Sequence, residues 1–183
     1  KEIFEESNKF VEGVFTQDYI DKTPWTDLLT DDMKKHWQNY SFQGFRLEGG
    51  KLEAVGPAAG STANALMAIP DAGGFRDLDL EMEFTLKGVV DVGFRVFKRF
   101  DNTVEFYTLS TTGQDPLKAG QTYTLHATYV GNKLSGTLSP GDSTLASVES
   151  SWTKQRKGAV AVQVREAAEF KVSKLRIREL RNF

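Results

Sequence analysis

The chain lacks cysteine altogether and has only two histidines among its 183 residues. Without cysteine there is no disulfide framework, no thiolate nucleophile and no zinc site built on thiolates. With His36 and His126 alone, a histidine-based metal site is not expected. No segment approaches the roughly 20 consecutive apolar residues that a membrane helix requires, so membrane insertion is not expected either.

An excess of one sign of charge is also missing. The chain has 23 basic and 25 acidic residues, which gives a net charge of −2. Such a balance creates no field that would attract nucleic acid or an anionic membrane. The Gly-x-Ser-x-Gly elbow, the P-loop and the dinucleotide fingerprint are absent as well. Neither nucleic acid nor a nucleotide cofactor is therefore expected as a partner.

What the chain does contain is typical of one globular domain, with 39% hydrophobic and 11% aromatic residues. Residues 1–23 differ from the rest, because apolar side chains such as Phe4, Phe10 and Val14 recur at helical spacing. We expect a short amphipathic helix or arm here, with a linker ordered only by packing as the alternative. The main domain is expected to span residues 24–183.

The main domain is dominated by strand and turn signals. Thr30 is expected to cap a short helical turn that ends at Trp37. Gly49-Gly50 and Gly131-Asn132 each separate two strand-like runs, which predicts two hairpins. In all, strands are expected over residues 45–48, 51–55, 65–69, 77–86, 90–96, 104–107, 121–130, 133–138, 144–148, 159–165 and 170–178. Short strands at this regular spacing predict an all-β antiparallel sandwich or barrel.

Three successive segments between Asp77 and Leu109 alternate apolar and polar residues, and many of the polar residues are charged. Because side chains alternate across a strand, each segment should direct its polar set to one face of a sheet. If the three segments share a sheet, that face would present Glu81, Glu83, Asp91, Arg95, Glu105 and Tyr107 together. The pattern makes this face a candidate for chemistry or sugar binding.

The order of the motifs resembles the 3-keto-disaccharide hydrolase domain family, formerly a domain of unknown function. The resemblance covers about residues 24–180. It rests on Thr26-Asp27-Leu28-Leu29 with Trp37, on Gly50-Lys51-Leu52, on residues 75–84, on Val92-Gly93-Phe94-Arg95, on Val104-Glu105-Phe106-Tyr107, and on residues 158–162 and 170–180.

This resemblance implies a concanavalin- or laminin-G-like jelly roll of two antiparallel sheets with one concave open face. It also implies a bacterial protein that is periplasmic or extracellular and acts on glycosides. The sequence departs from the family at Thr30-Asp31, at Asp91-Val92 and at Glu105-Phe106-Tyr107. The last two departures fall in strands expected to line the concave face, so the family's fold is carried over more securely than its activity.

Glycoside hydrolysis requires a proton donor and a second carboxylate held about 5 to 9.5 Å apart. The prediction therefore assigns acid and base to Glu83 with Glu105 or Asp91, while Arg95 orients a hydroxyl or stabilises an enolate. Substrate contacts are assigned to Tyr107, Phe97, Glu81 and Trp37. The alternative is a solvated strand face with cross-strand ion pairs, and a tryptophan that only closes the core.

Two rival functions stay open from the sequence. One is a non-catalytic binding module, of lectin or laminin-G type, that recruits a longer parent protein to a glycan or to another protein. The other is a purely structural sandwich. No cofactor is expected, although calcium on loop oxygens stays open because acidic and amide side chains are available at Asp71, Asp77, Asp101, Asn102 and Asp115.

Overall fold

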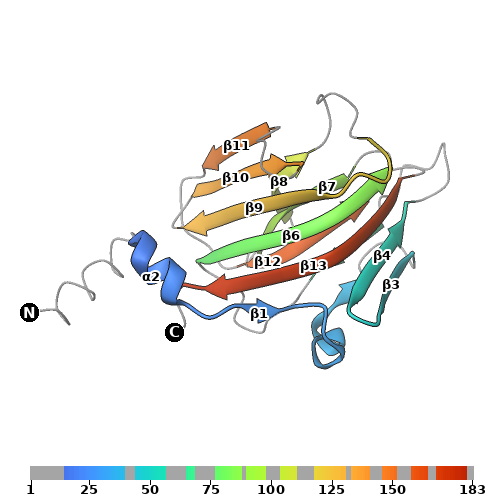
Figure 1. Ribbon diagram of the computed structural model, residues 1–183, viewed down its shortest axis with the longest axis horizontal. Helices are drawn as coiled ribbons and strands as arrows, with labels where there is room; N and C mark the ends of the chain where they lie inside the picture. The colour runs from blue at the N-terminus through green and yellow to red at the C-terminus, as the bar shows by residue number, and fades with distance from the viewer. Residues whose placement is uncertain are drawn as a thin grey trace, which may run out of the picture.

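Two antiparallel sheets form the body of the protein in a computed structural model (Figure 1). The structure describes residues 15–39, 44–56, 65–68, 77–87, 90–97, 104–110, 118–130, 133–140, 146–151, 158–164 and 168–180. The elements are α2 (Gln17–Lys22), β1 (Thr26–Asp27), the 3-10 helix η1 (Asp31–His36), β2 (Gln38–Asn39), β3 (Phe45–Glu48), β4 (Lys51–Val55), β5 (Ala65–Ala68), β6 (Leu78–Lys87), β7 (Val90–Phe97), β8 (Val104–Ser110), β9 (Tyr123–Val130), β10 (Lys133–Ser139), β11 (Ala146–Ser151), β12 (Gly158–Val164) and β13 (Glu169–Glu179).

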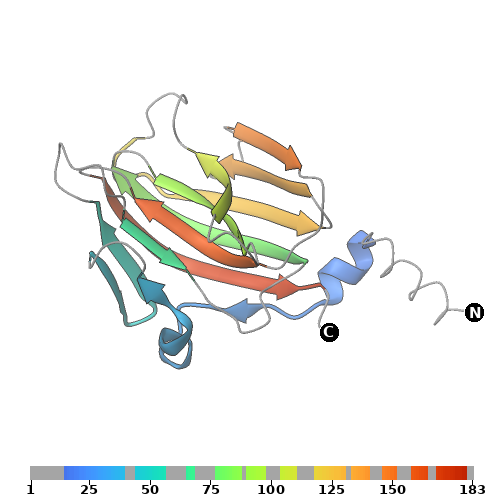
Figure 2. The same cartoon turned by 180° about the vertical axis from the view of Figure 1, so that it is seen from behind.

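The larger sheet has eight strands. Seven follow the order β11-β10-β9-β6-β13-β4-β3, and the eighth, β1, pairs with β13. The smaller sheet has five strands in the order β2-β5-β12-β7-β8. Seen from behind, the smaller sheet lies over the larger one as a second layer (Figure 2). The all-β sandwich of two antiparallel sheets is therefore confirmed.

Both predicted hairpins are present. Gly49 and Gly50 connect β3 and β4 with φ angles of 58° and 71°, the left-handed region that a two-residue type I′ turn requires. β9 and β10 pair antiparallel with Val130 opposite Lys133, so only two residues connect them. These turns fix the register of the two hairpins and hence which side chains face the core.

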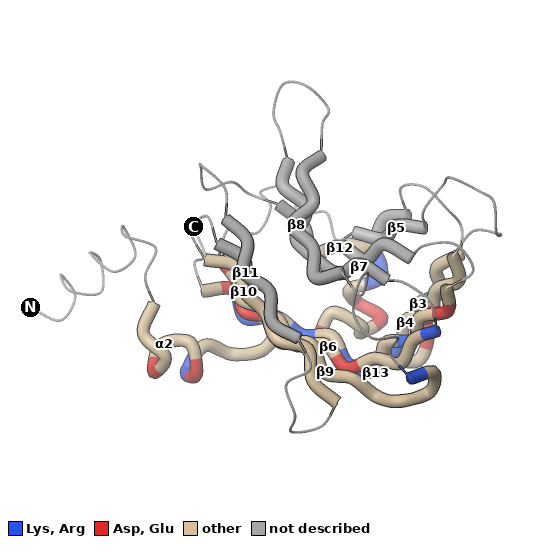
Figure 3. The backbone as a smooth tube through the Cα atoms, turned by 90° about the horizontal axis from the view of Figure 1, so that it is seen from above, with Lys and Arg blue, Asp and Glu red and all other residues tan. Residues whose placement is uncertain are grey.

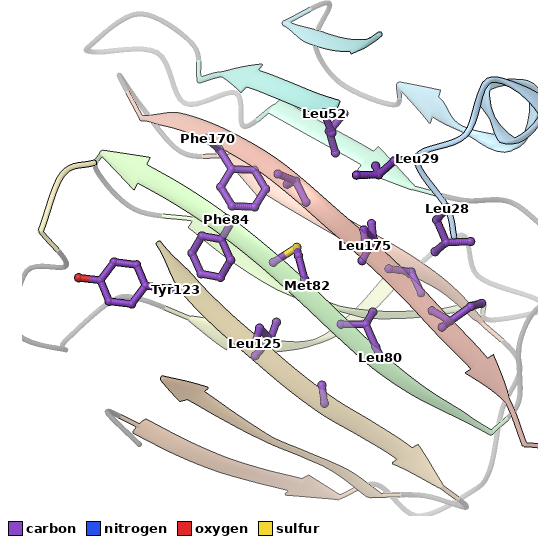
Figure 4. Packing of buried hydrophobic residues seen from close by; sticks show 14 of the residues in the cluster. Leu28, Leu29, Leu52, Leu80, Met82, Phe84, Tyr123, Leu125, Phe170 and Leu175 are labelled. Atoms are coloured by element: carbon purple, nitrogen blue, oxygen red, sulfur yellow. The ribbon is translucent and has the colours of Figure 1, made fainter. Parts of the chain in front are cut away.

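The core lies between the sheets and is built from alternate residues of the larger sheet. In β6 the even positions Leu80, Met82 and Phe84 are buried, as the alternation predicts. Phe84 packs against Phe170 with ring centroids 5.3 Å apart (Figure 4). Val160 of β12 belongs to the same cluster, so the smaller sheet also contributes to it.

A β-bulge in β13 decides which of its residues face the core. The register with β6 shifts between Val172 and Lys174, so Ser173 is an extra residue in the ladder. Before the bulge the buried residues are Phe170 and Val172, and after it they are Leu175 and Ile177. The shift leaves Lys174, Arg176 and Arg178 on the opposite, outer face of the larger sheet.

The N-terminal part was only partly anticipated. The helix expected around Phe4, Phe10 and Val14 lies outside the described residues. The structure instead has α2, which the sequence reading missed although Thr16 caps it by accepting a hydrogen bond from the Tyr19 N–H at 3.2 Å. The short strands β1 and β2 were missed as well, whereas η1 follows Thr30 and ends before Trp37 as expected.

α2 is attached to the end of β13 by polar contacts. The Tyr19 hydroxyl donates to the Leu180 carbonyl at 2.9 Å, and Arg178 donates to the Ile20 carbonyl. The division into residues 1–23 and residues 24–183 stays a prediction, but these contacts connect the last turn of the arm with the sandwich.

Candidate functional site

The three acidic segments do not share one sheet, which corrects the central geometric expectation. β6 lies in the larger sheet between β9 and β13, whereas β7 and β8 lie in the smaller sheet beside β12. Glu81 and Glu83 are therefore separated from Asp91, Arg95 and Glu105 by the sandwich. Alternation within a strand defines two faces but does not say which strands pair, and this is why the sequence reading failed here.

Within the smaller sheet the register separates the predicted residues again. Arg95 pairs with Phe106, whereas Glu105 pairs with Val96, so Arg95 and Glu105 occupy positions on opposite faces of the ladder. Tyr107, two residues from Glu105, shares its face.

Asp91 and Phe97 occupy the same face as Arg95 because they are an even number of residues away. On β12, Arg95 is opposite Ala159 and Phe94 is opposite the buried Val160. The roles assigned to these residues stay predictions.

Glu81 and Glu83 lie on the outer face of the larger sheet and are paired with cations of β13. The Lys174 Nζ lies 2.6 Å from a Glu81 carboxylate oxygen and 3.2 Å from one of Glu83, and Arg176 lies 3.1 Å from Glu81. Burial raises the pKa of Glu81, but the hydrogen bonds from Lys174 and Arg176 outweigh it and leave the pKa lowered. These contacts match the alternative of a cross-strand ion-pair face, since both carboxylates are paired with cations of the neighbouring strand.

A buried carboxylate lies beside this ladder. Asp79 is 2% exposed, and its Oδ1 is 2.5 Å from the His126 Nε2 and 3.3 Å from the Thr128 hydroxyl that donates to it. The Arg178 Nε lies 3.7 Å from the other carboxylate oxygen. His126 itself is exposed. The hydrogen bond to Asp79 raises the pKa of His126, and burial of the ring partly offsets this rise.

Trp25 completes this face at the β1 side. The guanidinium carbons of Arg176 and Arg178 lie 4.3 Å and 4.0 Å from the centroid of its ring, a cation–π arrangement. Both guanidinium groups are also paired with carboxylates of β6, so the ring is tied to the ion-pair ladder. Trp25 immediately precedes β1, a strand too short to be predicted from the sequence.

Trp37, predicted to contact substrate, is a core residue here. It is 8% exposed, and its indole N–H donates to the Leu28 carbonyl at 3.0 Å. This buried position favours the alternative left open by the sequence, a tryptophan that closes the edge of the sandwich core.

An open hollow of about 250 Å³ lies on the β3–β4 hairpin. Its lining side chains belong to Arg46, Glu48, Lys51 and Glu53. All four are exposed, and the register pairs them as Arg46 with Glu53 and Glu48 with Lys51. Acidic and basic residues thus alternate across the larger sheet from this hairpin to β6 (Figure 3).

No group of three or more potential metal ligands occurs among the residues that the structure describes. Of the candidates for calcium, Asp77 is buried, and its carbonyl accepts a hydrogen bond from the Leu180 N–H at 2.9 Å. Asp71, Asp101, Asn102 and Asp115 lie outside the described residues. Within the described part of the chain, no helix is long and apolar enough to cross a membrane.

Comparison of the structure with solved proteins shows the class of sandwich. A protein of unknown function with a galectin-like fold from Bacillus subtilis superposes with a TM-score of 0.62 and 10% identity, covering 85% of this chain and 94% of that one. The chain has a galectin-like and concanavalin-like sandwich fold. No protein-family model matches it, and no match was found among curated proteins.

Two further similar structures are lectin domains. The exoplasmic/lumenal domain of VIP36, in a form bound to Ca²⁺ and Man2, has a TM-score of 0.56 and 7% identity, covering 84% of this chain and 85% of that one. The carbohydrate recognition domain of Emp46p, in a potassium-bound form, has a TM-score of 0.51 and 12% identity, covering 84% and 95%. At these identities the likeness establishes the fold alone. The resemblance to the keto-disaccharide hydrolase family is likewise supported only as far as the sandwich.

Proposed function

We propose that this protein is a carbohydrate-binding module of lectin type that holds a glycan without cleaving it. The observation that carries the proposal is the separation of the expected acid and base. Glu83 is ion-paired with Lys174 on the larger sheet, while Asp91 and Glu105 belong to the smaller sheet and occupy opposite faces of it. A hydrolase would need two carboxyl groups on the two sides of one glycosidic bond.

The fold supports the same proposal. Its structural neighbours include a mannose-bound lumenal domain and a carbohydrate recognition domain, so a sandwich of this kind can present a glycan-binding face. By analogy we place the protein in an exported, lumenal or extracellular setting. The VIP36 domain was solved in a Ca²⁺-bound form, so calcium is included in the test of this proposal.

A glycan array followed by calorimetric titration tests the proposal. We expect binding to at least one glycan and no release of sugar after long incubation with it. Repeating the titration after chelation with EDTA decides whether calcium takes part. If no glycan binds with or without calcium, the proposal is wrong, and a hydrolase, a protein-binding module or a structural sandwich is left.

The second candidate is a hydrolase of 3-keto-disaccharides, favoured by the order of the motifs and by the positions of Asp91 and Arg95 on one face of β7. In that case the chain turns over a 3-keto-disaccharide, and Arg95→Ala and Asp91→Asn each abolish turnover while the fold is retained. Turnover that persists in both variants and in Glu105→Gln would exclude the assigned residues.

A further inference from the structure

The outer face of the larger sheet contains one row of side chains with fixed orientations. Across five neighbouring strands, the register pairs each residue with the next one in the row: Thr137 of β10, His126 of β9, Glu81 of β6, Arg176 of β13 and Asp27 of β1. We call these five residues the cross-strand row. Since neighbouring strands lie about 4.8 Å apart, His126 and Asp27 are separated by about 14 Å, the length of a short oligosaccharide.

The middle of the row is held rigidly. Glu81 accepts from Arg176 at 3.1 Å and is paired with Lys174 at 2.6 Å. His126 is held through Nε2 by Asp79, whose side chain is only 3% exposed, and this contact leaves Nδ1 as the ring nitrogen available to a ligand. Burying the Asp79 carboxylate costs free energy because it loses its water. Because this carboxylate orients the exposed His126, we interpret the pair as serving ligand binding more than stability.

Trp25 lies at one end of the row, partly exposed, with the guanidinium groups of Arg176 and Arg178 close to its ring. Its ring contacts the Arg176 guanidinium at 4.3 Å, and the same Arg176 is paired with Glu81. An aromatic ring beside fixed hydrogen-bonding groups suits a sugar, whose apolar face stacks while its hydroxyls both donate and accept. Exposed hydroxyl groups of Ser135 and Thr137 on β10 add small polar groups at the other end.

The charges around the row indicate what kind of sugar would bind. The carboxylates of Asp79, Glu81 and Glu83 are matched by the cations of Lys174, Arg176 and Arg178, all within the contacts described above. With His126 neutral, the remaining carboxylate of the row, Asp27, leaves one negative charge, which disfavours an anionic ligand. The balance therefore favours a neutral oligosaccharide over a sialylated or sulfated one.

From these observations we propose that the cross-strand row, together with Trp25, is a binding surface for a neutral oligosaccharide on the larger sheet. It is distinct from the face of the smaller sheet that contains Asp91 and Arg95. This inference rests on the proposed carbohydrate-binding function and names the site and the ligand class.

An array of neutral, sialylated and sulfated oligosaccharides, followed by calorimetry with the strongest binder, tests the inference. We expect a neutral binder, and an affinity about tenfold weaker in Glu81→Gln and in His126→Ala, as for loss of a hydrogen bond to a charged or oriented group. Glu53→Gln, on the same face but at the β3–β4 hairpin, serves as the matched control and should bind as the unmodified protein does.

The outcomes separate the two proposals. If the unmodified protein binds a glycan, but Arg95→Ala abolishes binding while Glu81→Gln and His126→Ala retain it, the site inference is wrong and the carbohydrate-binding function stands. If the strongest binder is sialylated or sulfated, the ligand class is wrong. If nothing on the array binds, both proposals fail. Circular dichroism and the melting temperature of each variant show whether a loss of binding is a loss of fold, and amide chemical shifts of the unmodified protein during titration then locate the ligand without any substitution.

Discussion

His126 and Asp79 contact each other diagonally across the β6–β9 pair, since His126 is opposite Glu81 in the register and Asp79 is opposite Thr128. The Nε2–Oδ1 distance is 2.5 Å. The His126 side chain is exposed and the Asp79 side chain is buried, so an exposed ring is bonded to a buried carboxylate.

This contact predicts a pH-dependent contribution to stability. The hydrogen bond to Asp79 raises the pKa of His126 above the ordinary histidine value of about 6.5, so the folded state binds the proton more tightly than the unfolded state. The stabilisation is fully present below the unfolded pKa of about 6.5 and is lost as the pH rises through the raised folded pKa. NMR titration of the His126 ring should show the raised pKa directly.

The Asp79→Asn variant is the control for this titration. Removing the carboxylate should return the pKa of His126 toward its ordinary value and flatten the pH dependence of the unfolding free energy near neutrality. A histidine pKa that is the same in both proteins would contradict the assigned cause.

Phe170→Ala should strongly destabilise the sandwich. Phe170 is fully buried and packs on Phe84, so the substitution leaves a cavity between the sheets and should cost about 3 to 5 kcal/mol. Urea unfolding followed by tryptophan fluorescence measures the change. Val55→Ala is the matched control because Val55 is 54% exposed, and its effect should stay within about 0.5 kcal/mol.

Gly49→Ala should cost about 1 to 2 kcal/mol through the backbone alone. Gly49 has φ 58°, and a Cβ added there would meet no atom within 4 Å, so crowding does not contribute. Gly49→Asn should cost less, because asparagine tolerates the left-handed region. Equal losses in the two variants, measured by thermal unfolding, would show that the turn does not need this conformation.

Trp37→Phe separates the two roles considered for this residue. The variant leaves the buried Leu28 carbonyl without its indole donor, which should cost about 1 to 3 kcal/mol of stability. Glycan affinity should not change, because the indole is only 8% exposed. A large loss of affinity with unchanged stability would restore Trp37 as a ligand contact.

Much of the fold could be predicted from the sequence because strand periodicity and turn residues are local signals. The bounds of β3 and β4 were predicted to the residue, since the two glycines and the alternation around Leu52 act within one hairpin. β1 was missed because two residues do not show a period, and it exists only through pairing with Arg176 and Ile177.

The candidate site was predictable only in part, for a different reason. The polar face of β6 could be read from its alternation, but its partners depend on which strands lie beside it. Nothing local to Asp91 or Glu105 indicates that β7 joins β12 instead of β6. The contacts of Lys174 and Arg176 with Glu81 likewise depend on the sheet order, which places β13 beside β6.

The bulge at Ser173 absorbs one extra residue of β13, so the residues on both sides of it keep the same alternation. Without Ser173, Lys174 would follow Val172 directly and still lie opposite Glu83, and Leu175 and Ile177 would still face the core. Deleting Ser173 should therefore straighten the strand and leave the core in place. If Ser173 instead took a regular place in the ladder, Lys174 and Arg176 would turn toward the core, so the bulge, and not the serine side chain, keeps the apolar face of β13 continuous.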